Sequence, residues 1–255
     1  MIADIWNGLL LEHWLWTAGF LFLRVAGIAG LAPVFGEQTL PVRLRLAAAV
    51  AFTLCVLPMM PPAAPMAPVR ALLFAGAEVA TGLLFGLILR LMVMGLQMAG
   101  AIAAQVTSLA QIAGAGVAAD PAPAVGSLLL AGGLAVAAAG GLHVRLVEYM
   151  AQSYVLVPFG SWPAPDTVAT AGLAAVGRVT ALGFSLALPF AALGLVYNVM
   201  LGVMSRAMPQ LMVVFIGAPV IVGLSLALLL LLSPLLLQIW HEALLFLLEN
   251  PDAAG

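Results

Sequence analysis

The chain has 255 residues, of which 65% are hydrophobic and 7% are charged, whereas a soluble domain carries roughly 25% charged residues. Its eight basic residues are all Arg and stand against ten Asp and Glu, which gives a net charge of −2. So few charges exclude a soluble enzyme, a disordered chain and a nucleic-acid-binding protein, and a single cysteine excludes a disulfide scaffold. The composition indicates an integral membrane protein in contact with lipid.

Six stretches approach the roughly 20 apolar residues that a membrane-spanning helix needs. They are 8–32, 44–58, 71–99, 125–142, 172–203 and 211–237, and an amphipathic tail follows at 238–249. Segments rich in Pro and Gly separate them, as is typical of chain breaks between helices. Because no segment is long and polar enough to form a soluble domain, we expect one all-α membrane domain over residues 1–255.

The third apolar stretch continues beyond a normal span, through three glutamines, to Asp120-Pro121. Polar or irregular backbone at membrane depth is tolerated only against protein or a water-filled cavity. We therefore expect residues 97–121 to face a pore or an interface, with an ordinary loop outside the membrane as the alternative.

Two rows of residues at four-residue spacing place small and charged side chains on one face of a helix. The first row is Glu78, Gly82, Gly86 and Arg90, and the second is Gly194, Asn198, Gly202 and Arg206. Glycines at this spacing let helices approach closely in a membrane. Packing within the chain and packing against other subunits explain the rows equally well.

Arg24 and Glu78 are charged residues within apolar stretches, where a charge costs several kcal/mol and marks a functional site by default. A salt bridge between helices or between subunits is the favoured interpretation. Glu78 and Arg90 are separated by about 18 Å along a helix, so they need different partners.

Four methionines recur at four-residue spacing around Pro209: Met200, Met204, Met208 and Met212. Flexible thioethers fill irregular gaps and adapt to varied surfaces. The row predicts ordinary helix packing or, alternatively, a seal around a moving chain.

No pattern of a catalytic, cofactor or metal site is present. His13, His143 and His241 lie far apart and lack the spacing of metal ligands. We therefore expect a protein that is not an enzyme and has no cofactor.

The ordered motifs resemble the FliR family of flagellar export-gate membrane proteins, which is homologous to the SctT family of injectisomes. The resemblance covers nearly the whole chain. It is carried by Arg24 to Gly27, Ala32 to Gly36, Leu40 to Leu46, Glu78, Gly82, Gly86, Asp120-Pro121, Asn198, Gly202, Arg206 to Leu211, Phe215, Gly217 and Pro219.

The resemblance implies a helical, closed-pore complex with FliP-like and FliQ-like subunits, joined by an FlhB-like subunit. It also implies a FliP-like part over about 1–170 and a FliQ-like helical hairpin with its tail over about 171–249. The pore or plug candidates that it suggests are Gln105, Gln111, Gly114, Gly116, Asp120 and Pro121. The subunit-packing candidates are Arg24, Glu78, Gly82, Gly86, Arg90, Asn198, Gly202, Arg206, Pro209 and Gln210.

We therefore expect a core subunit of the flagellar export gate, located in the bacterial inner membrane and passing unfolded flagellar subunits across it. Its partners would be the other gate subunits, the exported chains and membrane lipid, without nucleic acid. An injectisome homologue is one alternative, although the absence of Lys and Arg after Pro219 favours the flagellar branch. A small multi-pass transporter, with a substrate site around Glu78 or Arg24, is the alternative from a different class.

Overall fold

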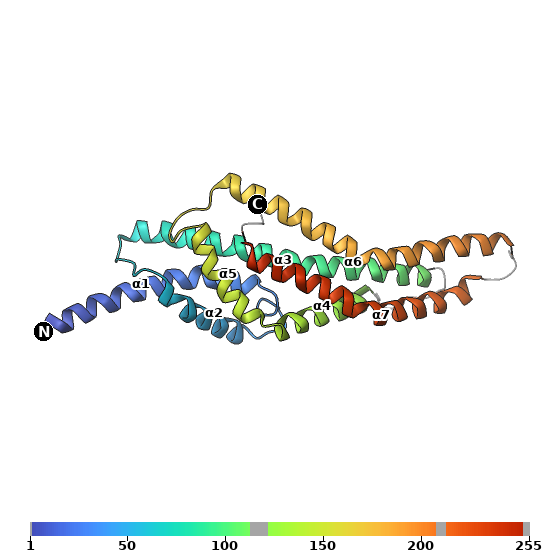
Figure 1. The fold of residues 1–255 in the computed structure, drawn as a ribbon, viewed down its shortest axis with the longest axis horizontal. Coiled ribbons are helices and arrows are strands. Elements are labelled where there is room, and N and C mark those ends of the chain that lie inside the picture. Colours follow the sequence, from blue (N-terminus) through green and yellow to red (C-terminus); the bar gives the residue numbers. More distant parts are fainter. Residues whose placement is uncertain (1, 113–121, 208–212, 252–255) are drawn as a thin grey trace. The chain divides into compact units, whose positions relative to one another are not determined.

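The computed structural model describes residues 2–112, 122–207 and 213–251. Within these ranges the chain forms seven α-helices and one short 3-10 helix, and it forms no strand (Figure 1). The helices are α1 (Ile2–Leu31), α2 (Val42–Val56), η1 (Leu57–Met59), α3 (Pro68–Ile112), α4 (Ala122–Ala139), α5 (Leu142–Leu156), α6 (Pro165–Ala207) and α7 (Val213–Glu249). The predicted all-α class is confirmed.

In the part of the chain that the structure describes, five helices are long and apolar enough to cross a membrane, over Leu11–Leu31, Val42–Met59, Pro68–Gln105, Pro165–Ala207 and Pro219–Glu249. A sixth candidate span is the pair α4 and α5, which meet at a bend of 78°. The bend falls at Gly140-Gly141, where Gly141 has a φ of 78° that few residues other than glycine adopt. The sequence analysis located the apolar stretch that ends here but did not predict α5.

Helix α7 extends without interruption to Glu249, so the expected separate tail at 238–249 is the last part of this helix. Two prolines, Pro219 and Pro234, lie inside it. Internal prolines are tolerated in membrane helices because neighbouring groups satisfy the freed backbone carbonyls.

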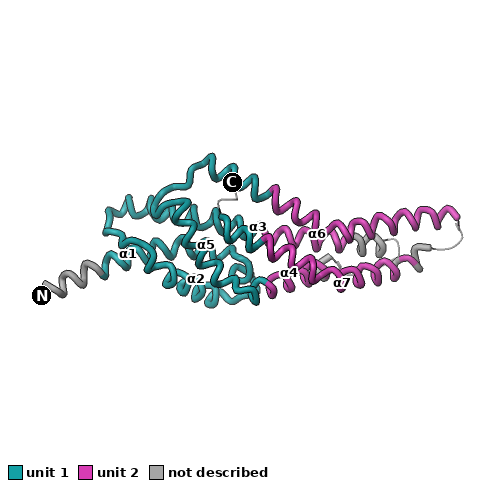
Figure 2. The backbone as a smooth tube through the Cα atoms, in the orientation of Figure 1, with its two compact units in different colours: residues 1–91, 137–176, 244–255 teal, residues 92–136, 177–243 magenta. Residues whose placement is uncertain are grey.

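The helices group into two compact units (Figure 2). Unit 1 contains residues 1–91, 137–176 and 244–255, and unit 2 contains residues 92–136 and 177–243. Each unit therefore combines segments that are far apart in the sequence. The expected division at about residue 170 into a FliP-like part and a hairpin stays a prediction.

In unit 1, α1 and α3 touch backbone to backbone at three glycines. A Cβ atom on Gly82 would overlap the carbonyl oxygen of Arg24, and one on Gly27 would lie 2.9 Å from the carbonyl carbon of Gly82. A Cβ atom on Gly86 would lie 2.7 Å from the carbonyl oxygen of Gly27. No larger residue fits at these positions unless the two helices separate.

Unit 2 also contains close helix contacts at glycines, between other helices. Gly95 on α3 faces Val179 on α6, where an added Cβ atom would lie 2.8 Å from the valine side chain. Gly100 on α3 meets Gly126 on α4 in a backbone contact. On α7, the buried Trp240 donates a hydrogen bond from Nε1 to the carbonyl oxygen of Met92 on α3, at 2.9 Å. These contacts hold α4, α6 and α7 against α3.

The glycine contacts predict opposite effects for the same substitution at two positions of α1. Alanine is favoured over glycine in a helix by roughly 1 kcal/mol, so Gly30→Ala, whose Cβ atom meets nothing within 4 Å, should slightly raise the melting temperature. Gly27→Ala should lower it, because overpacking against Gly82 costs roughly 1–3 kcal/mol. Thermal unfolding of the detergent-purified chain measures both variants, and equal melting temperatures would contradict the backbone contact.

Candidate functional site

Arg24, fully buried in the last third of α1, is the centre of the most connected polar cluster among the described residues. Its Nε atom donates to Glu78 Oε2 at 2.8 Å and its Nη2 atom donates to Glu78 Oε1 at 2.9 Å. Two parallel hydrogen bonds of this kind match the planar guanidinium to the carboxylate. The glutamate, on α3, is also fully buried.

The remaining donors of Arg24 bind the end of α5. Its Nη1 atom donates to the carbonyl oxygens of Ser153, at 3.1 Å, and Val157, at 2.8 Å. The carbonyls at the end of a helix carry partial negative charge, so a cation is favourable there. The guanidinium also lies 3.9 Å from the ring centroid of Tyr154, in a cation–π contact.

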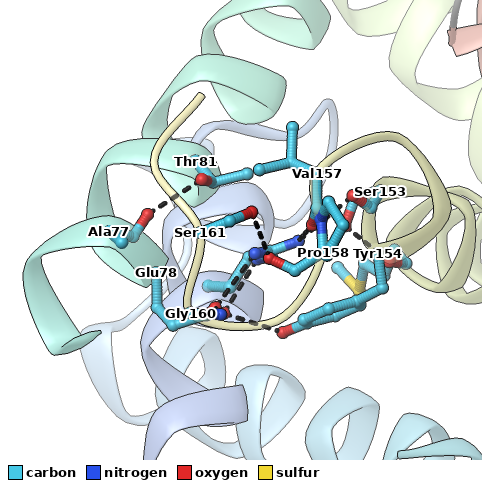
Figure 3. Close-up of polar contacts among 11 residues, drawn as sticks. Ala77, Glu78, Thr81, Ser153, Tyr154, Val157, Pro158, Gly160 and Ser161 are labelled. Atoms are coloured by element: carbon cyan, nitrogen blue, oxygen red, sulfur yellow. Dashed lines mark hydrogen bonds and ion pairs between the residues drawn. The ribbon is translucent and has the colours of Figure 1, made fainter. Parts of the chain in front are cut away.

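Glu78 accepts two further hydrogen bonds, which Figure 3 shows around its carboxylate. The backbone N–H of Gly160 donates to Oε1 at 2.7 Å, and the Tyr154 hydroxyl donates to Oε2 at 3.2 Å. Gly160 has a φ of 75°, which turns its N–H group toward α3 at a position where a side chain would collide with Phe74. The cluster therefore joins α1, α3, α5 and the loop between α5 and α6, and we call it the Arg24–Glu78 network.

Arg90, at the other end of the first row, has a separate partner, as its distance from Glu78 requires. Its Nη1 atom lies 2.6 Å from Glu37 Oε1, and the two side chains are 21% and 13% exposed. Glu37 lies in the turn between α1 and α2. All four members of the first row thus contact α1 or its following turn within the same chain, while their predicted role in packing against other subunits stays a prediction.

The second row lies mostly on the outside of unit 2. Asn198, Gly202 and Arg206 are exposed on α6, and an added Cβ atom on Gly202 would meet nothing within 4 Å. Only Gly194, the first member, is buried. Two rows with the same spacing therefore differ in what they contact within the described residues.

The methionine and plug candidates are placed only in part. Met200 and Met204 are 43% and 40% exposed on α6, and Gln105 is exposed on α3. Gln111 falls in α3, but its side chain is not described. The other candidates lie outside the described residues: Gly114, Gly116, Asp120, Pro121, Met208, Pro209, Gln210 and Met212.

The sequence analysis did not identify the partners of the charged residues. Glu37 and the carbonyl groups of Ser153 and Val157 lie 53 to 133 residues from the arginines that they bind, and Gly160 lies 82 residues from Glu78. No local pattern connects such positions. Tyr154, one of two tyrosines in α5, carried a weak signal as a polar aromatic residue. A buried hydroxyl of this kind normally finds a hydrogen-bond partner.

The geometry supports a structural role for these charges. Arg24 donates four hydrogen bonds and Glu78 accepts four, all with groups of this chain, and both side chains are fully buried, so neither faces a substrate. Among the residues that the structure describes, no three His, Cys, Asp or Glu side chains come close enough to hold a metal ion.

These features define the class as a multi-pass helical membrane protein in which buried charges and glycines hold the helices together. A family model described as "Bacterial export proteins, family 1" matches residues 15–246, and the chain belongs to this family.

Three similar proteins are each named flagellar biosynthetic protein FliR. The protein of Caulobacter vibrioides is 29% identical over 231 residues, covering 89% of this chain and 92% of the relative. The protein of Escherichia coli K12 is 26% identical over 234 residues, covering 88% of each chain. That of Pectobacterium carotovorum is 26% identical over 229 residues, covering 87% of this chain and 86% of the relative.

Family and relatives together confirm four predictions: membership of the FliR family, a flagellar export-apparatus protein, a location in the bacterial inner membrane, and a role that is not enzymatic.

The Arg24–Glu78 network predicts that Glu78→Gln strongly destabilises the chain. The substitution keeps the shape of the side chain but leaves the buried guanidinium without a counter-charge, and breaking a buried pair costs roughly 3–5 kcal/mol. Arg24→Lys should act in the same direction, because an ammonium group cannot make the two parallel bonds. The measurement is the fraction of full-length chain that elutes as a monodisperse, folded species after mild heating in detergent.

Arg145→Met provides the control. Arg145 pairs with Glu148 at 3.4 Å and with Glu249 at 3.1 Å, but its side chain is 42% exposed. Exposed pairs contribute roughly 0–1 kcal/mol, so this variant should behave nearly as the unchanged chain does. If Glu78→Gln were as stable as Arg145→Met, the network would not hold the unit together.

Proposed function

We propose that this chain is a core subunit of the flagellar type III export gate, which forms a closed pore with FliP-like and FliQ-like subunits and passes unfolded flagellar subunits across the inner membrane. The observation that carries the proposal is the family match over residues 15–246, together with FliR proteins that align over about nine tenths of the chain. An FlhB-like subunit would associate with this assembly.

The exposed surface of α6 and α7 supports a role inside an assembly. Large apolar side chains are exposed along both helices, for example Leu195 (67%) on α6 and Leu230 (77%) on α7. Apolar area of this kind is stable only against lipid or other apolar protein. The exposed polar positions Asn198 and Arg206 on α6 favour protein over lipid on that face, because polar groups in lipid need partners.

The internal division that we propose follows the resemblance to the family. Residues up to about 170 would form the FliP-like part, and α6 with α7 would form the FliQ-like hairpin. The two helices run over Pro165–Ala207 and Val213–Glu249, with a short connection at 208–212. The segment from Gln105 to Asp120 would form the plug of the closed pore, in agreement with the exposed, polar Gln105 on α3.

The two alternatives are less well supported. The three relatives are flagellar proteins by name, which favours the flagellar branch over the injectisome branch. A solute transporter would need Arg24 or Glu78 for its substrate, and both side chains are fully buried and fully hydrogen-bonded.

Deleting the encoding gene should abolish filaments, motility and the export of filament subunits, while uptake of small solutes continues. Re-expression of the unchanged chain should restore all three, and Gly27→Ala should restore less than Gly30→Ala. Electron microscopy of the cells and immunoblots of exported subunits in the medium provide the measurement. Normal filaments in the deletion strain would refute the proposed function.

A further inference from the structure

Val34, in the turn between α1 and α2, has an unusual backbone conformation. Its φ of 68° lies in the left-handed region, which a β-branched residue rarely adopts. The N–H group of Phe35 donates to the carbonyl oxygen of Pro33 at 2.8 Å, so Val34 is the central residue of a γ-turn with positive φ, a rare and strained type of turn. Strain of this kind persists only where the surrounding structure enforces it, and it is typical of switch regions.

Packing against α1 and α2 restrains the turn. The N–H group of Gly36 donates to the carbonyl oxygen of Ala32 at 2.8 Å, and a Cβ atom on Gly36 would lie 2.6 Å from the carbonyl oxygen of Gly30. Phe35 packs edge-on against the buried ring of Phe52 on α2, with ring centroids 5.1 Å apart. The turn is therefore folded back onto the end of α1.

An ion pair to α3 is a further restraint on the turn. Arg90 donates from Nη1 to Glu37 Oε1 at 2.6 Å. The Glu37 side chain is 13% exposed and that of Arg90 is 21% exposed, whereas Arg24 and Glu78 are fully buried. The pair between Arg90 and Glu37 is therefore open to water and to a competing charge.

The ion pair and the strain at Val34 act against each other. Glu37 follows Val34 by three residues, so the positive φ sets the direction in which the chain carries Glu37 toward Arg90. Ion pairs that are open to water stabilise a fold weakly, and the cost of a left-handed backbone outside glycine is of similar size or larger. Two conformations of the turn thus have comparable free energies, which is the condition for a switch.

We propose that residues 32–40 form a two-state latch. In its closed state, which the structure shows, Val34 has a positive φ and Glu37 binds Arg90. In its released state Val34 has an extended backbone, the hydrogen bond of the γ-turn is broken, and Glu37 is separated from Arg90. The turn then moves away from α3, and α2 moves with it because Phe35 packs on α2.

Release of the latch is a step in the transport of flagellar subunits, and this part of the inference rests on the proposed function. A glycine at position 34 would adopt the closed conformation without strain. Valine makes the closed state less stable and so keeps the released state accessible. A turn that only had to connect two helices would gain stability from the glycine.

Arg90→Gln tests the ion pair. Loss of the charge should raise the released population roughly fivefold, as expected for a pair that is partly open to water. Glu37→Arg combined with Arg90→Glu reverses the pair and should close the latch again, which separates loss of the pair from misfolding.

Val34→Asn tests the strain, in the Arg90→Gln chain where the released state is more populated. Asparagine adopts a positive φ several-fold more often than other residues do, so this variant should lower the released population roughly tenfold. Val34→Ile keeps the branched side chain and its strain. It is the matched control and should leave the population unchanged.

Distances between two spin labels, measured by pulsed EPR on the full chain, report the two states. The labels are attached at Thr39→Cys, exposed in the turn, and at Leu83→Cys, where Leu83 is 49% exposed on α3. The natural Cys55, also exposed, is replaced by Ser. One main distance is expected in the unchanged chain, and a second distance should appear in Arg90→Gln. Labels at Leu73→Cys and Leu83→Cys, both on α3, provide the control and should keep one distance in every variant.

Export is measured by immunoblots of filament subunits in the medium, at equal amounts of chain in the membrane. Val34→Asn alone should reduce export roughly tenfold, in proportion to the released population, while Val34→Ile exports as the unchanged chain does. A single distance in Arg90→Gln, equal effects of Val34→Asn and Val34→Ile, or full export in Val34→Asn would each overturn the inference. Deletion of the gene tests the proposed function separately, so the two failures are distinguishable.

Discussion

The bidentate bond between Arg24 and Glu78 is the interaction on which the rest of unit 1 depends. Two charges removed from water are stable only if the pair has good geometry and its remaining donors and acceptors are satisfied. Here the carbonyls at the end of α5 take the spare arginine donors, and Gly160 and Tyr154 donate to the spare glutamate lone pairs. The position of α5 and of the loop that follows it is therefore a consequence of the ion pair.

The glycines and the ion pair depend on each other. Gly82 lies one turn after Glu78 on α3, and it contacts the backbone of α1 at Arg24 itself. A side chain at position 82 would push α1 away at the point where the guanidinium must reach the carboxylate. Small residues allow close helix approach in membranes, and here that approach also sets the geometry of the hydrogen bonds. The four-residue spacing places Glu78 and Gly82 on the same face of α3, so one helix contact sets both the packing and the ion pair.

Part of this arrangement is predictable from the sequence, and there is a physical reason why the remaining contacts are not. Apolar length predicts the helices that could span a membrane, and charges inside apolar stretches predict buried pairs, because both follow from local composition. The choice of Glu37 for Arg90, or of Gly160 for Glu78, depends on distances between segments 53 and 82 residues apart. Helix α5 was not predicted because the apolar stretch 125–142 ends at its first residue, whereas the structure continues from α4 through a bend into a second helix.

The two glycine rows show why spacing alone does not determine what a helix face contacts. Gly86 and Gly202 stand at equivalent places in rows that each end in an arginine, yet one touches backbone and the other has open space around it. The difference arises because α1 supplies a glycine, Gly27, opposite the first row, while no described segment covers Gly202. Small residues facing each other let two helix backbones touch. Among the described residues nothing lies within 4 Å of a Cβ atom on Gly202, so the role of Asn198, Gly202 and Arg206 in packing against other subunits stays a prediction.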